Sequence, residues 1–195
     1  MPLLEAQLTS EAQLERYPIT TDVYHQMIKQ GMFTSNDKIE LLEGDLIKMS
    51  AVGPRHAACV DRLSEILRTE FGKSITLRHQ NPVELSDFSE PEPDITILRR
   101  REDFYALAHP APEDVLLLIE ISESTLKKDR GIKLSAYAKA GIVEYWIVNL
   151  QDDIIEVYTS PAGSSYQVTR IVHRHETLSP VLLSSVVLEA DEVLG

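Results

Sequence analysis

One segment, residues 115–121, limits the folds open to this chain more than any other feature. It reads VLLLIEI and is the most apolar stretch of the sequence. A run of this length is too short to cross a membrane, and it is typical of a strand that is buried on both faces. The segment therefore predicts the central strand of a sheet.

The elements around this strand predict an α/β fold with a mixed sheet. Pro54 suits the first position of a helix, which is expected to run to about Phe71 and to end at Gly72. A second helix is expected over residues 130–140, ending at Gly141. The strand-like segments are residues 75–77, 82–85, 94–98, 115–121 and 143–149. The core order is therefore helix, three strands, helix, strand.

The two ends of the chain add smaller elements to this core. Residues 1–17 predict a loosely attached arm, and residues 18–195 a single domain, which suits the length of 195 residues. A short helix should begin after Thr20 and stop by Gly31. Residues 39–49 predict a hairpin, and so do residues 154–172, with Pro161-Ala162-Gly163 as the turn. A last apolar strand is expected near residues 181–188.

Composition narrows the range of functions. Asp and Glu number 31 against 19 Lys and Arg, so the net charge is −12, which argues against a general nucleic-acid coat or a binder of anionic membranes. A local metal ion can still overcome that repulsion. Cys59 is the only cysteine and excludes both an intramolecular disulfide and a four-thiolate zinc site. With no secretory signal and no apolar run of membrane-spanning length, we expect a cytoplasmic protein without membrane contact.

Two acidic residues lie beside apolar strands, where burial makes a charge costly. Asp94 directly precedes one predicted strand, and Glu120 lies within the most apolar segment. A buried carboxylate needs a metal ion, a cation or exposure at the strand end. Because Mg²⁺ and Mn²⁺ prefer oxygen ligands, the pair predicts a site for Mg²⁺ or Mn²⁺. The alternative is that Glu120 is solvated at a strand end and Asp94 caps a turn.

Polar residues after Glu120 could complete such a site. Ser122 lies two residues further and shares a strand face with Glu120. Lys133 and Tyr137 are four residues apart and share a helix face, from which the lysine could reach the strand ends as a point charge. The alternative is an ordinary solvated lysine.

Taken together, a set of short motifs resembles the Uma-two type family of restriction-endonuclease-like proteins. The resemblance runs from about Thr20 to the C-terminus and depends on the order and spacing of the motifs. The matching residues are the segment IELLEG from Ile39, Pro54 and His56, the segment PDI from Pro93, the segment IEISEST from Ile119, Asp129, Lys133-Leu134, and the segment YAKAGIVEYW from Tyr137. The resemblance implies a PD-(D/E)XK fold in αβββαβ order, with additional C-terminal strands.

The resemblance also implies roles for particular residues. Asp94 and Glu120 would bind the divalent metal ion, and Glu40 would assist. The usual motif has lysine two residues after the second acid, where this chain has Ser122, so the catalytic lysine must come from elsewhere. The family pattern favours Lys133. The sequence favours it independently, because Lys127 and Lys128 are expected on a mobile loop and would lose more entropy on positioning.

His56, at the start of a helix, is expected either to act as a general base or support a metal ligand, or to be a simple surface residue.

Three hypotheses about function follow. The first is a Mg²⁺- or Mn²⁺-dependent nuclease that hydrolyses phosphodiester bonds of DNA, with a homodimer as one way to cut two strands. The second is a catalytically degenerate nuclease fold that binds nucleic acid or protein, suggested by Ser122 and the charge of −12. The third is metal-dependent hydrolysis of a small phosphoester.

Overall fold

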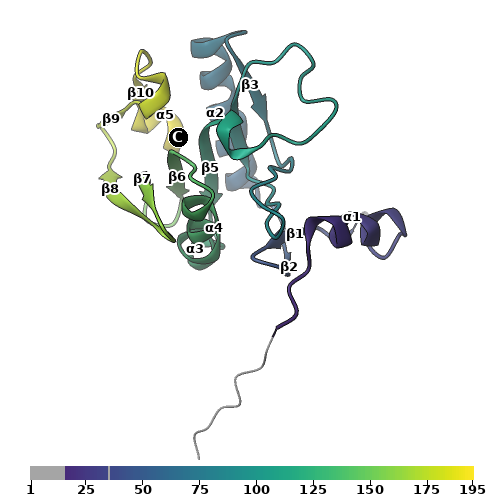
Figure 1. Ribbon diagram of the computed structural model, residues 1–195. Helices are drawn as coiled ribbons and strands as arrows, with labels where there is room; N and C mark the ends of the chain where they lie inside the picture. The colour runs from purple at the N-terminus through teal and green to yellow at the C-terminus, as the bar shows by residue number, and fades with distance from the viewer. Residues whose placement is uncertain (1–15, 35) are drawn as a thin grey trace, which may run out of the picture.

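A six-stranded mixed sheet forms the centre of the computed structural model, which describes residues 16–34 and 36–195 (Figure 1). Only the β5–β6 pair is parallel, and each other pair of neighbouring strands is antiparallel. All eight residues of β5 are buried, as predicted for a central strand. In their order across the sheet, the strands are β3 (Ile75–Arg78), β4 (Ile95–Arg99), β5 (Val115–Ser122), β6 (Glu144–Asn149), β7 (Ile154–Ala162) and β8 (Ser165–Val172).

Helices cover both faces of this sheet. On one face, α2 (Pro54–Phe71) and the short α5 (Ala190–Leu194) pack over side chains such as Leu117 and Ile119. On the other face, α4 (Leu134–Lys139) packs over residues that include Leu118. The predicted order of helix, three strands, helix and strand is therefore confirmed. Among the described residues, no helix has the length and apolar character needed to cross a membrane.

A small N-terminal layer extends from one side of this core (Figure 1). It consists of α1 (Thr21–Lys29), whose first turn is capped by the hydroxyl of Thr20, and of a hairpin made by β1 (Ile39–Leu42) and β2 (Asp45–Lys48). The turn residues Glu43 and Gly44 both have positive φ angles, so the predicted hairpin is confirmed. Residues 1–15 of the predicted arm lie outside the described residues, and the division into an arm and one domain stays a prediction.

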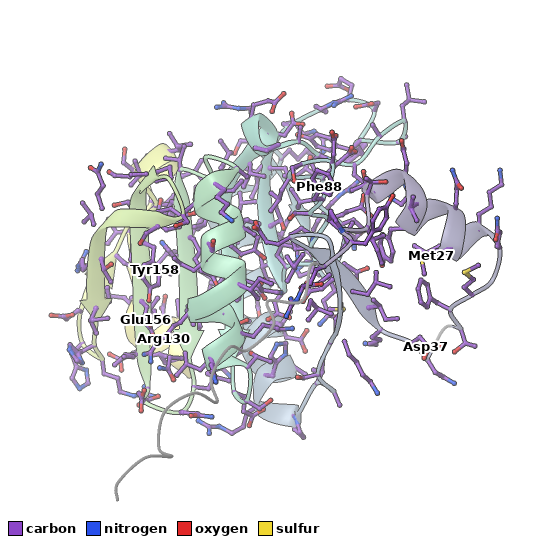
Figure 2. The ribbon with its side chains drawn as sticks, turned by 60° about the horizontal axis from the view of Figure 1, so that its bottom comes forward. Met27, Asp37, Phe88, Arg130, Glu156 and Tyr158 are labelled. Carbon is purple, nitrogen blue, oxygen red and sulfur yellow. The ribbon has the colours of Figure 1, made fainter. Side chains whose placement is uncertain are left out.

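The second helix begins earlier than predicted. It is continuous from α3 (Leu126–Lys128) through a π-helical segment (Asp129–Lys133) into α4. A bidentate ion pair from Arg130 to Glu156 on β7 ties this helix to the sheet, with distances of 2.8 and 2.7 Å, and the Tyr158 hydroxyl donates to the same carboxylate (Figure 2). The expectation of a loop before Arg130 is therefore wrong.

Three expected elements differ from the structure. Residues 82–85 form no strand, because backbone hydrogen bonds to Pro91, Ser89 and Pro110 hold them in a loop. Residues 181–188 contain a 3₁₀ turn (Val181–Leu183), and only Leu188 of this range is extended, in β10 (Leu188–Glu189) paired with β9 (Thr177–Leu178). The hairpin turn lies at residues 163–164, since β7 extends through Ala162.

Candidate active site

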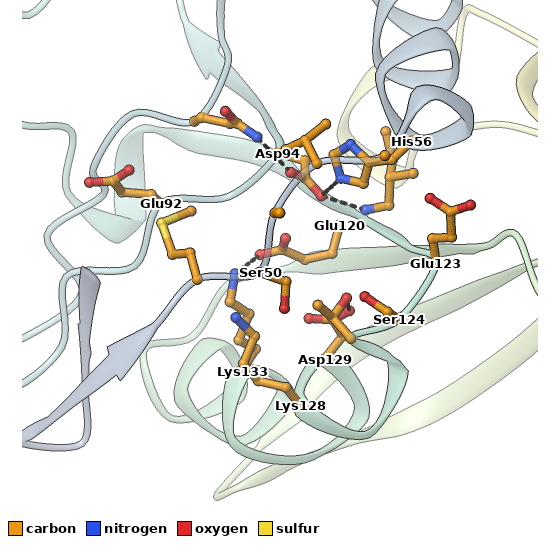
Figure 3. Close-up of a pocket in the computed structure, with 17 residues that line it drawn as sticks. Ser50, His56, Glu92, Asp94, Glu120, Glu123, Ser124, Lys128, Asp129 and Lys133 are labelled. Atoms are coloured by element: carbon orange, nitrogen blue, oxygen red, sulfur yellow. Dashed lines mark hydrogen bonds and ion pairs between the residues drawn. The ribbon is translucent and has the colours of Figure 1, made fainter. Parts of the chain in front are cut away.

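The register of two strands brings the predicted acids together. Ile95 on β4 pairs with Ile119 on β5 in an antiparallel ladder, so Asp94 comes opposite Glu120 at the adjacent position. Both side chains line a pocket whose wall also includes the segment at residues 49–53, between β2 and α2, and the helix that follows β5 (Figure 3). Two acids that are 26 residues apart in sequence therefore line the same pocket.

Asp94 is held by three donors. The Nε2 atom of His56 donates to Oδ2 at 2.9 Å, the backbone N–H of Ile121 donates to the same oxygen at 2.8 Å, and Gln80 donates to Oδ1 at 3.3 Å. Burial alone would raise the pKa of Asp94, but the hydrogen bond and charge of His56, with the Ile121 N–H, outweigh it and hold the pKa below its usual value. Asp94 therefore stays ionised although it is buried.

Glu120 is held by the two residues predicted to share a helix face. The Lys133 ammonium donates to Oε1 at 2.7 Å, and the Tyr137 hydroxyl donates to the same atom at 2.6 Å. Burial raises the pKa of Glu120 above its usual value, and the charge of Lys133 opposes that shift. Its second oxygen, Oε2, receives no hydrogen bond from the residues that the structure describes. This oxygen is therefore the one that could bind a metal ion.

Glu40 comes from β1 and is completely buried. Its two oxygens contact two different lysines: Lys128 Nζ is 3.0 Å from Oε1, and Lys133 Nζ is 3.2 Å from Oε2. Burial alone would lower the pKa of Lys133, but Glu120 and Glu40 outweigh it and hold that pKa above its usual value. Lys133 is therefore a charged group, fixed between two carboxylates from different strands.

The remaining predicted residues have mixed outcomes. His56 is buried, so the alternative of a simple surface residue is wrong, and its Nδ1 atom has no hydrogen-bond partner within the described part of the chain. Ser122 is also buried, and its hydroxyl lies 3.5 Å from that of Thr125. The alternative of a solvated Glu120 is wrong, since its exposed fraction is 4%. The alternative of a turn cap at Asp94 is not supported either, because the described donors to its side chain come from distant parts of the chain.

Four charged residues of the pocket were not among the predicted site residues: Glu92, Glu123, Lys128 and Asp129. Asp129 is almost fully buried and accepts a hydrogen bond from the Thr125 hydroxyl at 2.5 Å. The spacing of Thr125, Asp129 and Lys133 at intervals of four is the signal that could have placed Asp129 on the inner face of a helix. Glu92 offers no such signal, because it lies in a loop between two prolines.

The oxygen donors fit a hard divalent cation. Mg²⁺ is bound through one or two carboxylates and keeps several waters, and Asp94 with the free Oε2 of Glu120 provides that set. Among the described residues, no group of three or more His, Cys, Asp or Glu side chains could hold a metal ion. Mg²⁺ does not need such a group, because it keeps several of its waters.

Comparisons with known proteins identify the family and the fold of the chain. The model of the Uma2 family, described as "Putative restriction endonuclease", matches residues 21–191. A solved structure with the same fold is "a putative nuclease belonging to DUF820" from Anabaena variabilis ATCC 29413, with 16% sequence identity, a TM-score of 0.68, and coverage of 91% of this chain and 98% of that chain. No curated protein matches. Since the family model covers most of the sequence, the chain belongs to the Uma2 family.

Proposed function

We propose that this protein is a Mg²⁺- or Mn²⁺-dependent nuclease that hydrolyses phosphodiester bonds of DNA. The proposal rests on the presence of two carboxylates and a fixed lysine in one pocket. Asp94, Glu120 and Lys133 all line it, and the Nζ atom of Lys133 lies 2.7 Å from Oε1 of Glu120. The family description and the nuclease-like fold support phosphodiester chemistry over other metal-dependent reactions.

Each side chain of the site has a separate task in this proposal. A bound metal ion would lower the pKa of a coordinated water and neutralise charge on the phosphate. Asp94 and Glu120 hold that ion, while His56 and Tyr137 keep the two carboxylates oriented through their hydrogen bonds.

Lys133 supplies the positive charge that the usual motif position, Ser122, does not. An ammonium group has three N–H donors, and Lys133 directs two of them to Glu120 and Glu40. The third donor remains for a phosphate oxygen, whose charge increases in the transition state. Glu40 assists by holding the lysine through a second ion pair.

The test is cleavage of supercoiled plasmid with Mg²⁺ or Mn²⁺, each with and without chelator. Asp94→Asn and Glu120→Gln each remove a charge but little volume, so both should fold and lose metal-dependent cleavage. Glu65→Gln, on the exposed face of α2, is the matched control and should cut normally. Wild-type cleavage by both site variants would contradict the assignment.

The alternative, a degenerate module that binds without cutting, predicts a different result. Ser122 at the usual lysine position and the net charge of −12 favour it. It predicts measurable metal binding with no nicking of plasmid DNA under any metal ion.

A twofold dimer stays a prediction, which the mass of the protein in solution tests.

A further inference from the structure

The π-helical segment at Asp129–Lys133 brings two lysines to the same carboxylate. In a regular α-helix, residues 128 and 133 would point about 140° apart around the axis. A π turn closes hydrogen bonds five residues apart, and here the N–H of Leu134 bonds to the carbonyl of Asp129. Residues with that spacing therefore come onto the same side, and both Lys128 and Lys133 reach Glu40.

The two lysines differ in how much of each is open to the pocket. The Lys133 side chain is 3% exposed, whereas that of Lys128 is 20% exposed, although both line the pocket (Figure 3). Lys128 has one contact with Glu40, which leaves two of its three N–H donors for another acceptor. Lys128 is therefore the more accessible cation.

The charge of the pocket makes that cation important. Five acids line the pocket, whereas the lysines and arginines among its described lining residues are Lys128 and Lys133 alone; the acids are Glu92, Asp94, Glu120, Glu123 and Asp129. The acids of this pocket repel an anionic substrate, except where a metal ion or a lysine supplies positive charge. With Lys133 fixed against Glu120, a second phosphate finds its cation at Lys128.

We propose that Lys128 is a second phosphate-binding residue of this site and contacts the phosphate next to the scissile one. The inference rests on the proposed function, since it takes DNA as the substrate. The two ammonium groups share one carboxylate, so they form a pair of contacts for consecutive phosphates of one strand. Glu40 then has a further role, because it sets the spacing of the pair.

The test measures binding of a fluorescent DNA duplex at several salt concentrations, with Ca²⁺ replacing Mg²⁺ so that affinity is measured apart from cleavage. Loss of one phosphate contact lowers the slope of log K against log salt by about 0.9. Lys128→Met should show that change and bind about tenfold more weakly. Lys127→Met, which removes the same charge from an exposed neighbour, should change neither quantity.

A second pair of variants keeps the test valid if Lys128→Met does not fold. The double variant Glu40→Gln/Lys128→Met removes both charges of the Glu40–Lys128 ion pair, and it is compared with Glu40→Gln alone. An unchanged salt slope in the folded Lys128 variants, or an equal change in Lys127→Met, overturns the inference.

The proposed function can fail separately. Binding that depends on Lys128 in a protein that never cuts would keep the phosphate contact and refute the nuclease. A wild-type protein that binds no DNA would refute both.

Discussion

Replacing Lys133 by methionine tests the ion network at the centre of the site. The side chain is 3% exposed and contacts both Glu120 and Glu40, so its loss leaves two buried carboxylates short of a counter-ion. Breaking a buried pair costs about 3–5 kcal/mol. We expect the lower end, about 3 kcal/mol, because Glu40 keeps Lys128 and Glu120 keeps the Tyr137 hydroxyl. That is a large share of the roughly 5–15 kcal/mol that stabilises a typical domain.

Urea unfolding in the presence of chelator measures this cost. The single tryptophan, Trp146, is completely buried and provides the fluorescence signal. The double variant Glu120→Gln/Lys133→Met removes both partners and should recover at least half of the lost stability. DNA cleavage should fall about 10²-fold in Lys133→Met, because the charge at the phosphate is absent. It should be lost in the double variant, which also lacks the proposed metal ligand Glu120. A loss below about 1 kcal/mol, or no recovery in the double variant, would refute the network.

Three further predictions concern a buried carboxylate, two glycines and the affinity for DNA. Burial would raise the pKa of Glu156, but hydrogen bonds from Arg130 and other donors hold it below its usual value. The ionised Glu156 therefore contributes its full stabilisation above about pH 4.3, the pKa of glutamate in an unfolded chain. This stabilisation is lost as the pH falls through the lower pKa of the folded state. When the pH is lowered from 7 to 3, the urea midpoint of Glu156→Gln should therefore fall less steeply than that of the wild type. A Cβ at Gly44, where φ is +80°, would lie 2.6 Å from the Cβ of Pro18, so Gly44→Ala should lower the unfolding free energy by about 2 kcal/mol. Gly131 has a helical backbone and open space around an added Cβ, so Gly131→Ala should raise the unfolding free energy by about 0.5 kcal/mol. DNA affinity should rise with divalent metal and fall steeply with monovalent salt, and fluorescence anisotropy that responds to neither would contradict a nucleic-acid partner.

Local patterns predicted the elements that carry strong signals. Pro54 and Gly72 flank a long amphipathic segment, and α2 begins and ends where they indicate. The apolar segment around Glu120 could only be a central strand, and its buried charge pointed to the site. Tyr137 and Lys133 were placed on one face because a helix of either kind keeps residues four apart close together.

The errors arise where tertiary contacts decide. No local pattern distinguishes a π turn from an α-helix, so the position of Lys128 beside Glu40 could not be read from spacing. Residues 82–85 have the apolar alternation of a strand, but their backbone groups bond to loop residues and to no neighbouring strand. Glu40, 54 residues before Asp94 in sequence, entered through the family resemblance and not through any pattern of its own.

Anomalous diffraction from crystals soaked in Mn²⁺ would locate the bound metal ion. We expect one strong peak in contact with an oxygen of Asp94 and with Oε2 of Glu120, and no peak there in crystals of Glu120→Gln. A wild-type crystal without a peak between these two carboxylates, or with its strongest peak at other residues, would contradict the proposal that they hold the catalytic metal ion.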